Sequence, residues 1–94
     1  MPHMTIDGCS LYYTDQGEGE KTVLLIHGLG SSTRDWEYQL PSLLPYYRVI
    51  CLDMRGHGQS DKSKGGYSIK RFADDCVAFI GKMQLIKPHI VGIS

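Results

Sequence analysis

Three short stretches of the chain are rich in leucine and β-branched residues and carry few polar ones. They are Thr22–Ile26, Tyr47–Leu52 and Pro88–Ile93. A strand covered on both faces has a continuous apolar run of this kind, because neither side of it meets water. We therefore predict three buried parallel strands.

The first residues follow a different pattern, in which polar and apolar side chains roughly alternate. Met4–Asp7 and Ser10–Thr14 have this alternation, and Asp7-Gly8 is a pair that tight hairpin turns favour. We predict an antiparallel hairpin here, followed by an exposed polar loop over residues 15–21.

A first helix is predicted after the strand that ends at Ile26. Ser32, with Asp35 three positions later, has the form of a capping box. Pro41 cannot lie inside an unbroken helix. We therefore expect a short helix to about Leu40, then a kink or a second turn through Leu44.

A second helix is predicted after Ser68, which is a suitable N-cap. Strands and helices then alternate, which is typical of a mostly parallel sheet with right-handed crossovers. The predicted fold class is α/β, a three-layer α/β/α arrangement with an antiparallel amino-terminal hairpin. The apolar positions of the second helix keep the 3.6-residue period: Ile69, Phe72, Ala73, Cys76, Phe79, Ile80 and Met83.

The composition of the chain mainly excludes certain classes of partner. Ten acidic residues balance ten basic ones, so the chain lacks the basic excess that nucleic acids or anionic membranes attract. The apolar run Val23–Ile26 is far too short to span a bilayer, and residues 1–7 do not resemble a secretory signal. We expect neither a nucleic-acid nor a membrane partner.

The cysteines Cys9, Cys51 and Cys76 are few and widely spaced. They form no Cys-x-x-Cys pair and no Cys/His spacing typical of zinc sites. We predict free thiols in a reducing, cytoplasmic compartment, and neither a metal nor an organic cofactor.

Chemistry-bearing residues follow each of the three buried strands. His27-Gly28-Leu29-Gly30 follows the first, Asp53 to Ser60 the second, and Gly92-Ile93-Ser94 ends the third. Two glycines around one leucine allow a tight turn with uncovered amide N–H groups. A serine at a sharp turn after a buried strand has its hydroxyl exposed, as a nucleophile requires.

Together these motifs resemble the amino-terminal third of an α/β-hydrolase, and the resemblance covers nearly the whole chain. Members of that family carry His-Gly-x-Gly, then Asp-x-Arg-Gly-x-Gly-x-Ser, then Gly-x-Ser-x-Gly at a nucleophile elbow. This chain has the first two motifs complete and the third as far as its serine.

The resemblance implies a role for each matching residue. Ser94 matches the nucleophile, and the backbone N–H of Leu29 matches one oxyanion-hole donor, which stabilises the charge that acyl transfer creates. Asp53 and Arg55 are either a buried pair that fixes the loops or contacts for the substrate, and the first interpretation is preferred. The residues expected to shape the two loops are His27, Gly28, Gly30, Asp53, Arg55, Gly56 and Gly58.

The sequence departs from the family pattern at its end. The second oxyanion N–H belongs to position 95, and the family's triad acid and histidine follow the serine. None of the four histidines, which are His3, His27, His57 and His89, matches the catalytic one. We therefore expect residues 1–94 to be the amino-terminal part of one α/β-hydrolase domain, inactive without the remainder of the same polypeptide.

The predicted function is that of a serine hydrolase acting on esters, lactones or related small acyl compounds through an acyl-enzyme on Ser94. One alternative is a non-catalytic α/β-hydrolase relative that serves as a binding module, or an inactive fragment. Another is a dinucleotide-binding oxidoreductase, because Gly28-x-Gly30 after a strand, with Asp53 after the next strand, imitates that motif.

Overall fold

A computed structural model describes residues 2–28, 30–62 and 68–92 of the chain. Its sheet has five strands in the order β1-β2-β4-β3-β5. β1 and β2 are antiparallel, as are β2 and β4, whereas β3 runs parallel to both β4 and β5. The strands are β1 His3–Ile6, β2 Cys9–Gln16, β3 Thr22–Ile26, β4 Arg48–Leu52 and β5 His89–Gly92.

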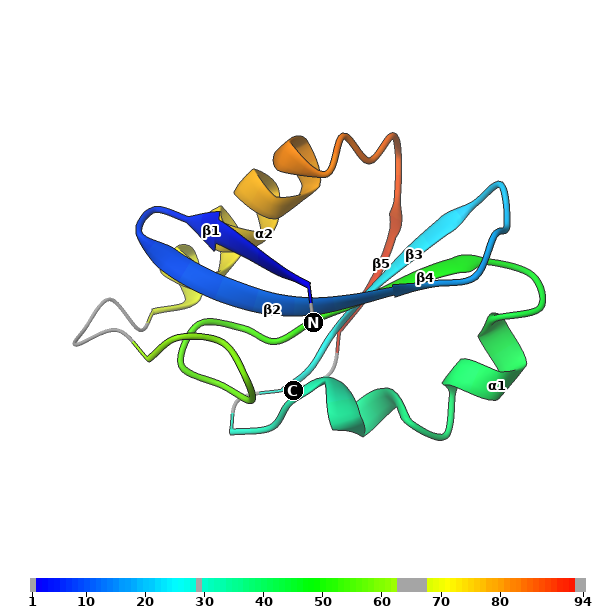
Figure 1. Ribbon diagram of the computed structural model, residues 1–94, viewed down its shortest axis with the longest axis horizontal. Helices are drawn as coiled ribbons and strands as arrows, with labels where there is room; N and C mark the ends of the chain where they lie inside the picture. Colours follow the sequence, from blue (N-terminus) through cyan, green and yellow to red (C-terminus); the bar gives the residue numbers. More distant parts are fainter. Residues whose placement is uncertain (1, 29, 63–67, 93–94) are drawn as a thin grey trace.

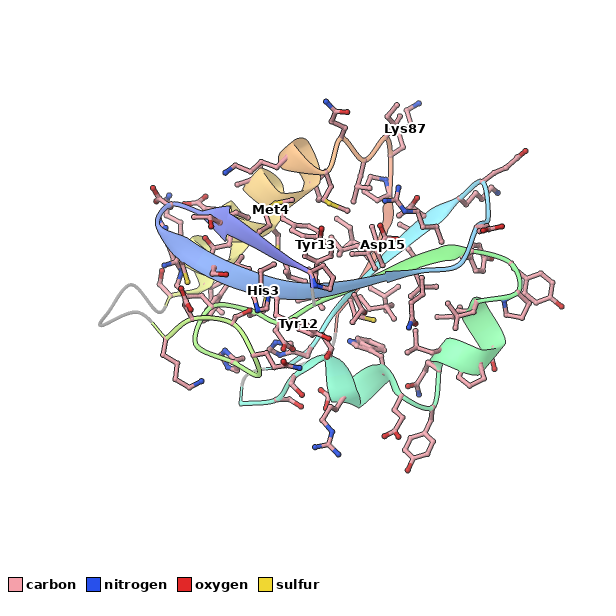
Figure 2. The ribbon with its side chains drawn as sticks, viewed as in Figure 1. His3, Met4, Tyr12, Tyr13, Asp15 and Lys87 are labelled. Carbon is pink, nitrogen blue, oxygen red and sulfur yellow. The ribbon has the colours of Figure 1, made fainter. Side chains whose placement is uncertain are left out.

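The hairpin prediction is confirmed, but β2 is longer than the predicted Ser10–Thr14. Its first half pairs with β1, with Cys9 opposite Ile6, and its second half pairs with β4, with Tyr13 opposite Leu52. Figure 2 shows Tyr12 and Tyr13 on opposite sides of this strand. Because β2 joins the hairpin to the parallel strands, it must continue past the hairpin.

Helices cover both faces of the sheet, as the predicted three-layer fold requires. In Figure 1, α2 (Ile69–Lys82) lies on one side, and α1 (Leu40–Leu43) on the other. Alternate residues of the central strands point to the two sides, so Leu24 and Ile50 belong to one core and Val23 and Val49 to the other. Phe79 of α2 is buried in the first core.

The helix predicted from Thr33 to about Leu40 is wrong in form. The segment holds a 3-10 turn, η1 (Thr33–Trp36), and then the separate α1, which begins with Pro41 in its first turn. The predicted capping box is confirmed for Ser32 as the N-cap but is wrong for Asp35. Ser32 caps η1 by accepting a hydrogen bond from the Arg34 N–H (3.3 Å), whereas the Asp35 carboxylate accepts from the Ser31 hydroxyl. Proline leaves no room for a longer helix, because its ring clashes with the preceding turn.

α2 matches the prediction closely. The Ser68 side chain accepts a hydrogen bond from the Arg71 N–H at 3.0 Å, which satisfies one of the free donors at the helix start. Among the described residues, neither α2 nor any other helix has the length and apolar character needed to cross a bilayer.

β5 is the last strand of the described sheet, beyond β3. Its residues are exposed, including Ile90 (55%) and Val91 (44%), which lie on a strand edge able to pair with another chain. The 94-residue chain expressed alone is expected to self-associate in sedimentation experiments. Ile90→Lys should reduce this association, and Ile69→Lys, at an exposed isoleucine on α2, should not. Equal association of both variants and the parent would contradict the edge explanation.

Candidate active site

The carboxyl ends of the three parallel strands, β3, β4 and β5, lie side by side at one edge of the sheet. Ile26 is aligned with Leu52 of β4 on one side and with Gly92 of β5 on the other. The chain passes from β3 to β4 on one side and then crosses over to β5, so a topological switch point lies here, which is where open α/β sheets bind ligands. Leu29 and Ser94, the predicted oxyanion donor and nucleophile, lie outside the described residues.

His27 links the loop after β3 to the loop after β4. It is buried, its Nε2 accepts a hydrogen bond from the Met54 N–H (2.9 Å), and its Nδ1 lies 2.7 Å from the Gly28 carbonyl oxygen. A backbone N–H only donates, so Nε2 is unprotonated, and Nδ1 carries the proton and donates to Gly28. Both nitrogens are occupied in the neutral ring, which leaves no free base.

The glycines on either side of position 29 differ in their surroundings. The Gly28 carbonyl also accepts from the Ser31 N–H (3.2 Å), which closes a turn. Gly30 is exposed, with a φ of +80°. Glycine adopts this left-handed conformation without the steric cost that a β-carbon would add.

Asp53 links the same two loops by a second route. Its carboxylate accepts hydrogen bonds from the Thr33 N–H (2.7 Å) and from the Gln59 N–H (2.9 Å). Asp53 is 1% exposed, and hydrogen bonds from amides to a buried charge are strong. The carboxylate therefore fixes the start of η1 relative to the loop over residues 53–61.

Gly58 lies against this carboxylate. Its φ is +50°, and a β-carbon built there would stand 2.5 Å from the carboxyl carbon of Asp53. We expect Gly58→Ala to lower the free energy of unfolding by about 2–5 kcal/mol, from left-handed backbone strain plus overpacking. Gly8→Ala is the matched control, because Gly8 has a φ of +79° and nothing within 4 Å. Equal losses in urea denaturation would show that the clash is unimportant.

Asp53 and Arg55 do not form the buried pair that the sequence suggested. Arg55 meets Asp75 of α2 instead, with Nε to Oδ2 at 3.0 Å and the second guanidinium nitrogen to Oδ1 at 3.1 Å. The hydrogen bond that Arg55 donates to the Asp75 carboxylate raises the pKa of Arg55 above its ordinary value. Asp53 instead accepts hydrogen bonds from the Thr33 and Gln59 N–H groups, so each of the two side chains has its own partners.

Sequence reasoning missed Asp75, and it named Ser60 only as the last residue of the motif that begins at Asp53, without a role. Asp75 lies three residues after Phe72 and four before Phe79, so it is an acid on the apolar face of α2, which is a signal for a buried partner. The Ser60 hydroxyl accepts from the Tyr12 N–H (2.8 Å) and donates to the Asp53 carbonyl (2.5 Å). No pattern in the sequence identifies that contact.

The remaining loop residues close the turn after β4. The Gly56 N–H donates to the Asp61 carbonyl at 2.8 Å, and Gly56 has a φ of +79°. His57 has Nδ1 at 2.9 Å from the Arg55 carbonyl oxygen, and its ring centroid is 5.0 Å from that of His27. The loop is thus held by the backbone hydrogen bond between Gly56 and Asp61 and by the side chains of His57 and His27.

Metal ligands are not gathered in the part of the chain that the structure describes, where no three His, Cys, Asp or Glu side chains form a group suited to an ion. The chemistry available at this edge is that of backbone amides, glycine turns and buried hydrogen bonds.

The profile of the alpha/beta hydrolase fold family matches residues 21–94. The chain belongs to the alpha/beta hydrolase fold family.

Known alpha/beta hydrolase relatives extend the comparison. The chain is similar to the dihydrolipoyllysine-residue acetyltransferase component of the acetoin cleaving system of Cupriavidus necator, with 35% identity over 89 residues, covering 95% of this chain and 24% of that protein. It is similar to 3-oxoadipate enol-lactonase 2 of Acinetobacter baylyi, with 30% identity, covering 97% of this chain and 34% of that protein. The solved enol-lactonase of Burkholderia xenovorans LB400 superposes with a TM-score of 0.92 at 28% identity, over 99% of this chain and 37% of that one.

The chain therefore spans 24–34% of the length of these two curated relatives. The family match also weighs against the dinucleotide-binding alternative. That motif places a pyrophosphate at the start of a regular helix, whereas the element after the Gly28–Gly30 turn is the four-residue 3-10 turn η1.

The three cysteines of this alpha/beta hydrolase chain are unpaired, which confirms the prediction of free thiols. Burial raises the pKa of all three, that of Cys76 to about 11 from an ordinary 9.0. The thiolate is the reactive form. Iodoacetamide at pH 8 is therefore expected to alkylate Cys76 about a hundredfold more slowly in the folded protein than in urea. Peptide mapping that found equal rates would contradict the burial of this thiol.

Proposed function

We propose that the complete polypeptide is a serine hydrolase that cleaves carboxylic esters or lactones through an acyl-enzyme on Ser94. The observation that carries the proposal is the meeting of the His27–Gly30 loop and the 53–61 loop beside the end of β5. Ser94 follows that strand in the sequence by two residues. A nucleophile after one strand and donors after the neighbouring strand is the arrangement that acyl transfer needs.

In the proposed reaction, the Ser94 hydroxyl adds to the acyl carbonyl carbon and gives its proton to a histidine. The carbonyl oxygen becomes an oxyanion, which the Leu29 backbone N–H stabilises by hydrogen bonding. The alcohol leaves with the proton from the histidine, and water then releases the acid by the same steps. The histidine and its orienting acid belong to the remainder of the polypeptide, which is the partner that this chain requires.

Small acyl compounds are the proposed substrate class. Support comes from the similarity to two enol-lactonases and to (E)-2-((N-methylformamido)methylene)succinate hydrolase of Acinetobacter baylyi, with 37% identity to the last. No metal or organic cofactor takes part in the proposed reaction. We place the protein in the cytoplasm, because unpaired thiols suit a reducing compartment.

Labelling with a fluorophosphonate tests the proposed function. The complete polypeptide should react once, and peptide mapping should find the adduct on Ser94. Titration with a reduced nicotinamide cofactor in parallel should give no saturable binding. A folded protein that does not react would support the non-catalytic binding module, and saturable cofactor binding would support the dinucleotide-binding alternative.

A further inference from the structure

Three side chains on one face of α2 hold the loop that follows β4. Phe72 lies edge-on to the His57 ring, with centroids 6.0 Å apart. The Cys76 sulfur is 3.9 Å from the sulfur of Met54. Asp75 binds Arg55 with both carboxylate oxygens.

The Asp75–Arg55 pair is the strongest of these contacts and is almost fully removed from water. The exposed fractions of the two residues are 1% and 5%. A buried ion pair is costly to desolvate, and well-packed apolar residues are often as stable in its place. A role beyond stability is therefore worth seeking in what the pair fixes.

The pair is joined to a wider set of contacts. Arg55 also reaches the Ile6 carbonyl of β1 at 3.4 Å. Arg71 lies 3.6 Å from Asp75 and 2.6 Å from Asp7, in the turn between β1 and β2. The hairpin and α2 thus hold Arg55 from two sides.

The backbone next to Arg55 leads to the predicted oxyanion loop. Met54, its neighbour, donates its N–H to His27 Nε2 at 2.9 Å, and His27 Nδ1–H donates to the Gly28 carbonyl at 2.7 Å. Gly28 directly precedes Leu29 in the sequence. A fixed Arg55 therefore fixes Met54, which orients His27, which in turn holds the carbonyl before the proposed oxyanion donor.

We propose that Asp75 is a positioning residue for the active site, acting through Arg55, Met54 and His27 on the loop that carries Leu29. This inference rests on the proposed function for its effect on catalysis. The series of contacts that leads from Asp75 through Arg55, Met54 and His27 to Gly28 does not depend on the proposed function. A misplacement of the donor by about 1 Å is enough to lower a rate by roughly a hundredfold.

The test compares Asp75→Asn with Asp74→Asn in the complete polypeptide. Asp74 is the neighbouring aspartate on α2, but it forms an exposed ion pair with Lys70 at 2.7 Å. Asp75→Asn should lower kcat by about ten- to a hundredfold with KM unchanged. It should also speed amide hydrogen exchange of Met54 by about tenfold or more. Asp74→Asn should change neither quantity.

Because Asp75→Asn leaves the buried Arg55 guanidinium without an anionic partner, the variant can fail to fold. The double variant Arg55→Met with Asp75→Leu removes both charges and should fold with the urea midpoint of the parent. Continued low kcat and fast Met54 exchange in this stable protein would support positioning. Recovery of both to parental values, or failure of the double variant to fold, would overturn it, because the pair would then serve stability alone.

The two proposals fail in different ways. If the parent polypeptide does not react with a fluorophosphonate at Ser94, the proposed function fails. Met54 exchange in the folded variants still decides whether Asp75 controls the His27 loop. Wild-type exchange and wild-type kcat in Asp75→Asn would overturn the positioning role while leaving a reactive Ser94 in place.

Discussion

Replacing Ser94 by alanine in the complete polypeptide is expected to lower ester turnover by a factor on the order of 10⁶. Without the hydroxyl there is no acyl-enzyme, and only the binding groups and the oxyanion donors remain to stabilise the transition state. The measurement is hydrolysis of an activated ester, with circular dichroism used to verify the fold. The reason for so large an effect is that Ser94 makes and breaks the reacting bond.

Ser42→Ala is the control for this substitution, because Ser42 is an exposed serine in α1. It should retain parental kcat and KM. Ester turnover by folded Ser94→Ala at a rate close to that of the parent would exclude Ser94 as the nucleophile. A parent that is inactive toward every activated ester, while folded, would instead favour a non-catalytic member of the family.

Replacing Asp53 by alanine is expected to lower the free energy of unfolding by about 3–6 kcal/mol. The substitution leaves the Thr33 and Gln59 N–H groups without the buried carboxylate that accepts from both. Each such charge-assisted hydrogen bond contributes about 1.5–3 kcal/mol. Since whole domains have stabilities of about 5–15 kcal/mol, the variant should be close to unfolding.

Asp15→Ala is the matched control for Asp53→Ala. Asp15 likewise accepts two hydrogen bonds, in its case from the Arg48 guanidinium at 2.9 and 2.7 Å, but these two side chains are about one-third exposed, at 30% and 35%. A surface pair of this kind contributes up to about 1 kcal/mol. Urea denaturation that gave similar losses for the two variants would contradict the role assigned to the Asp53 carboxylate.

Much of the fold could be predicted because hydrophobic burial dominates its strands. β3 and β4 are buried on both faces, so their sequences carry no alternation, and the apolar face of α2 repeats with the helical period. Such patterns are local and can be read directly. The length of β2 could not, because its second half is decided by pairing with β4, which lies more than thirty residues away in the sequence.

The first helix shows where local rules compete. Ser32 and Asp35 match a capping box, but Asp35 accepts from Ser31, and Thr33 donates its N–H to Asp53. A different local contact, from the Ser31 hydroxyl, thus takes the Asp35 carboxylate, and a tertiary contact to Asp53 holds the start of η1. Pro41 then confined the next turn to the short α1.

For the candidate site, motifs indicated which loops matter but not which atoms meet. His27 and Asp53 were expected to shape loops, and each forms hydrogen bonds between the segments after β3 and β4. The partner of Arg55 was assigned wrongly, because nearness in sequence is a poor guide to ion pairing. Asp75 lies twenty residues away, yet it supplies the buried carboxylate.

The most direct test of the account is a crystal structure of the complete polypeptide inhibited by a fluorophosphonate. The inhibitor imitates the tetrahedral intermediate on the nucleophile. We expect its phosphorus to be bonded to the Ser94 oxygen, and its phosphoryl oxygen to lie about 2.7–3.1 Å from the Leu29 nitrogen. An adduct on another residue, or a phosphoryl oxygen that Leu29 does not contact, would contradict the proposed hydrolase site.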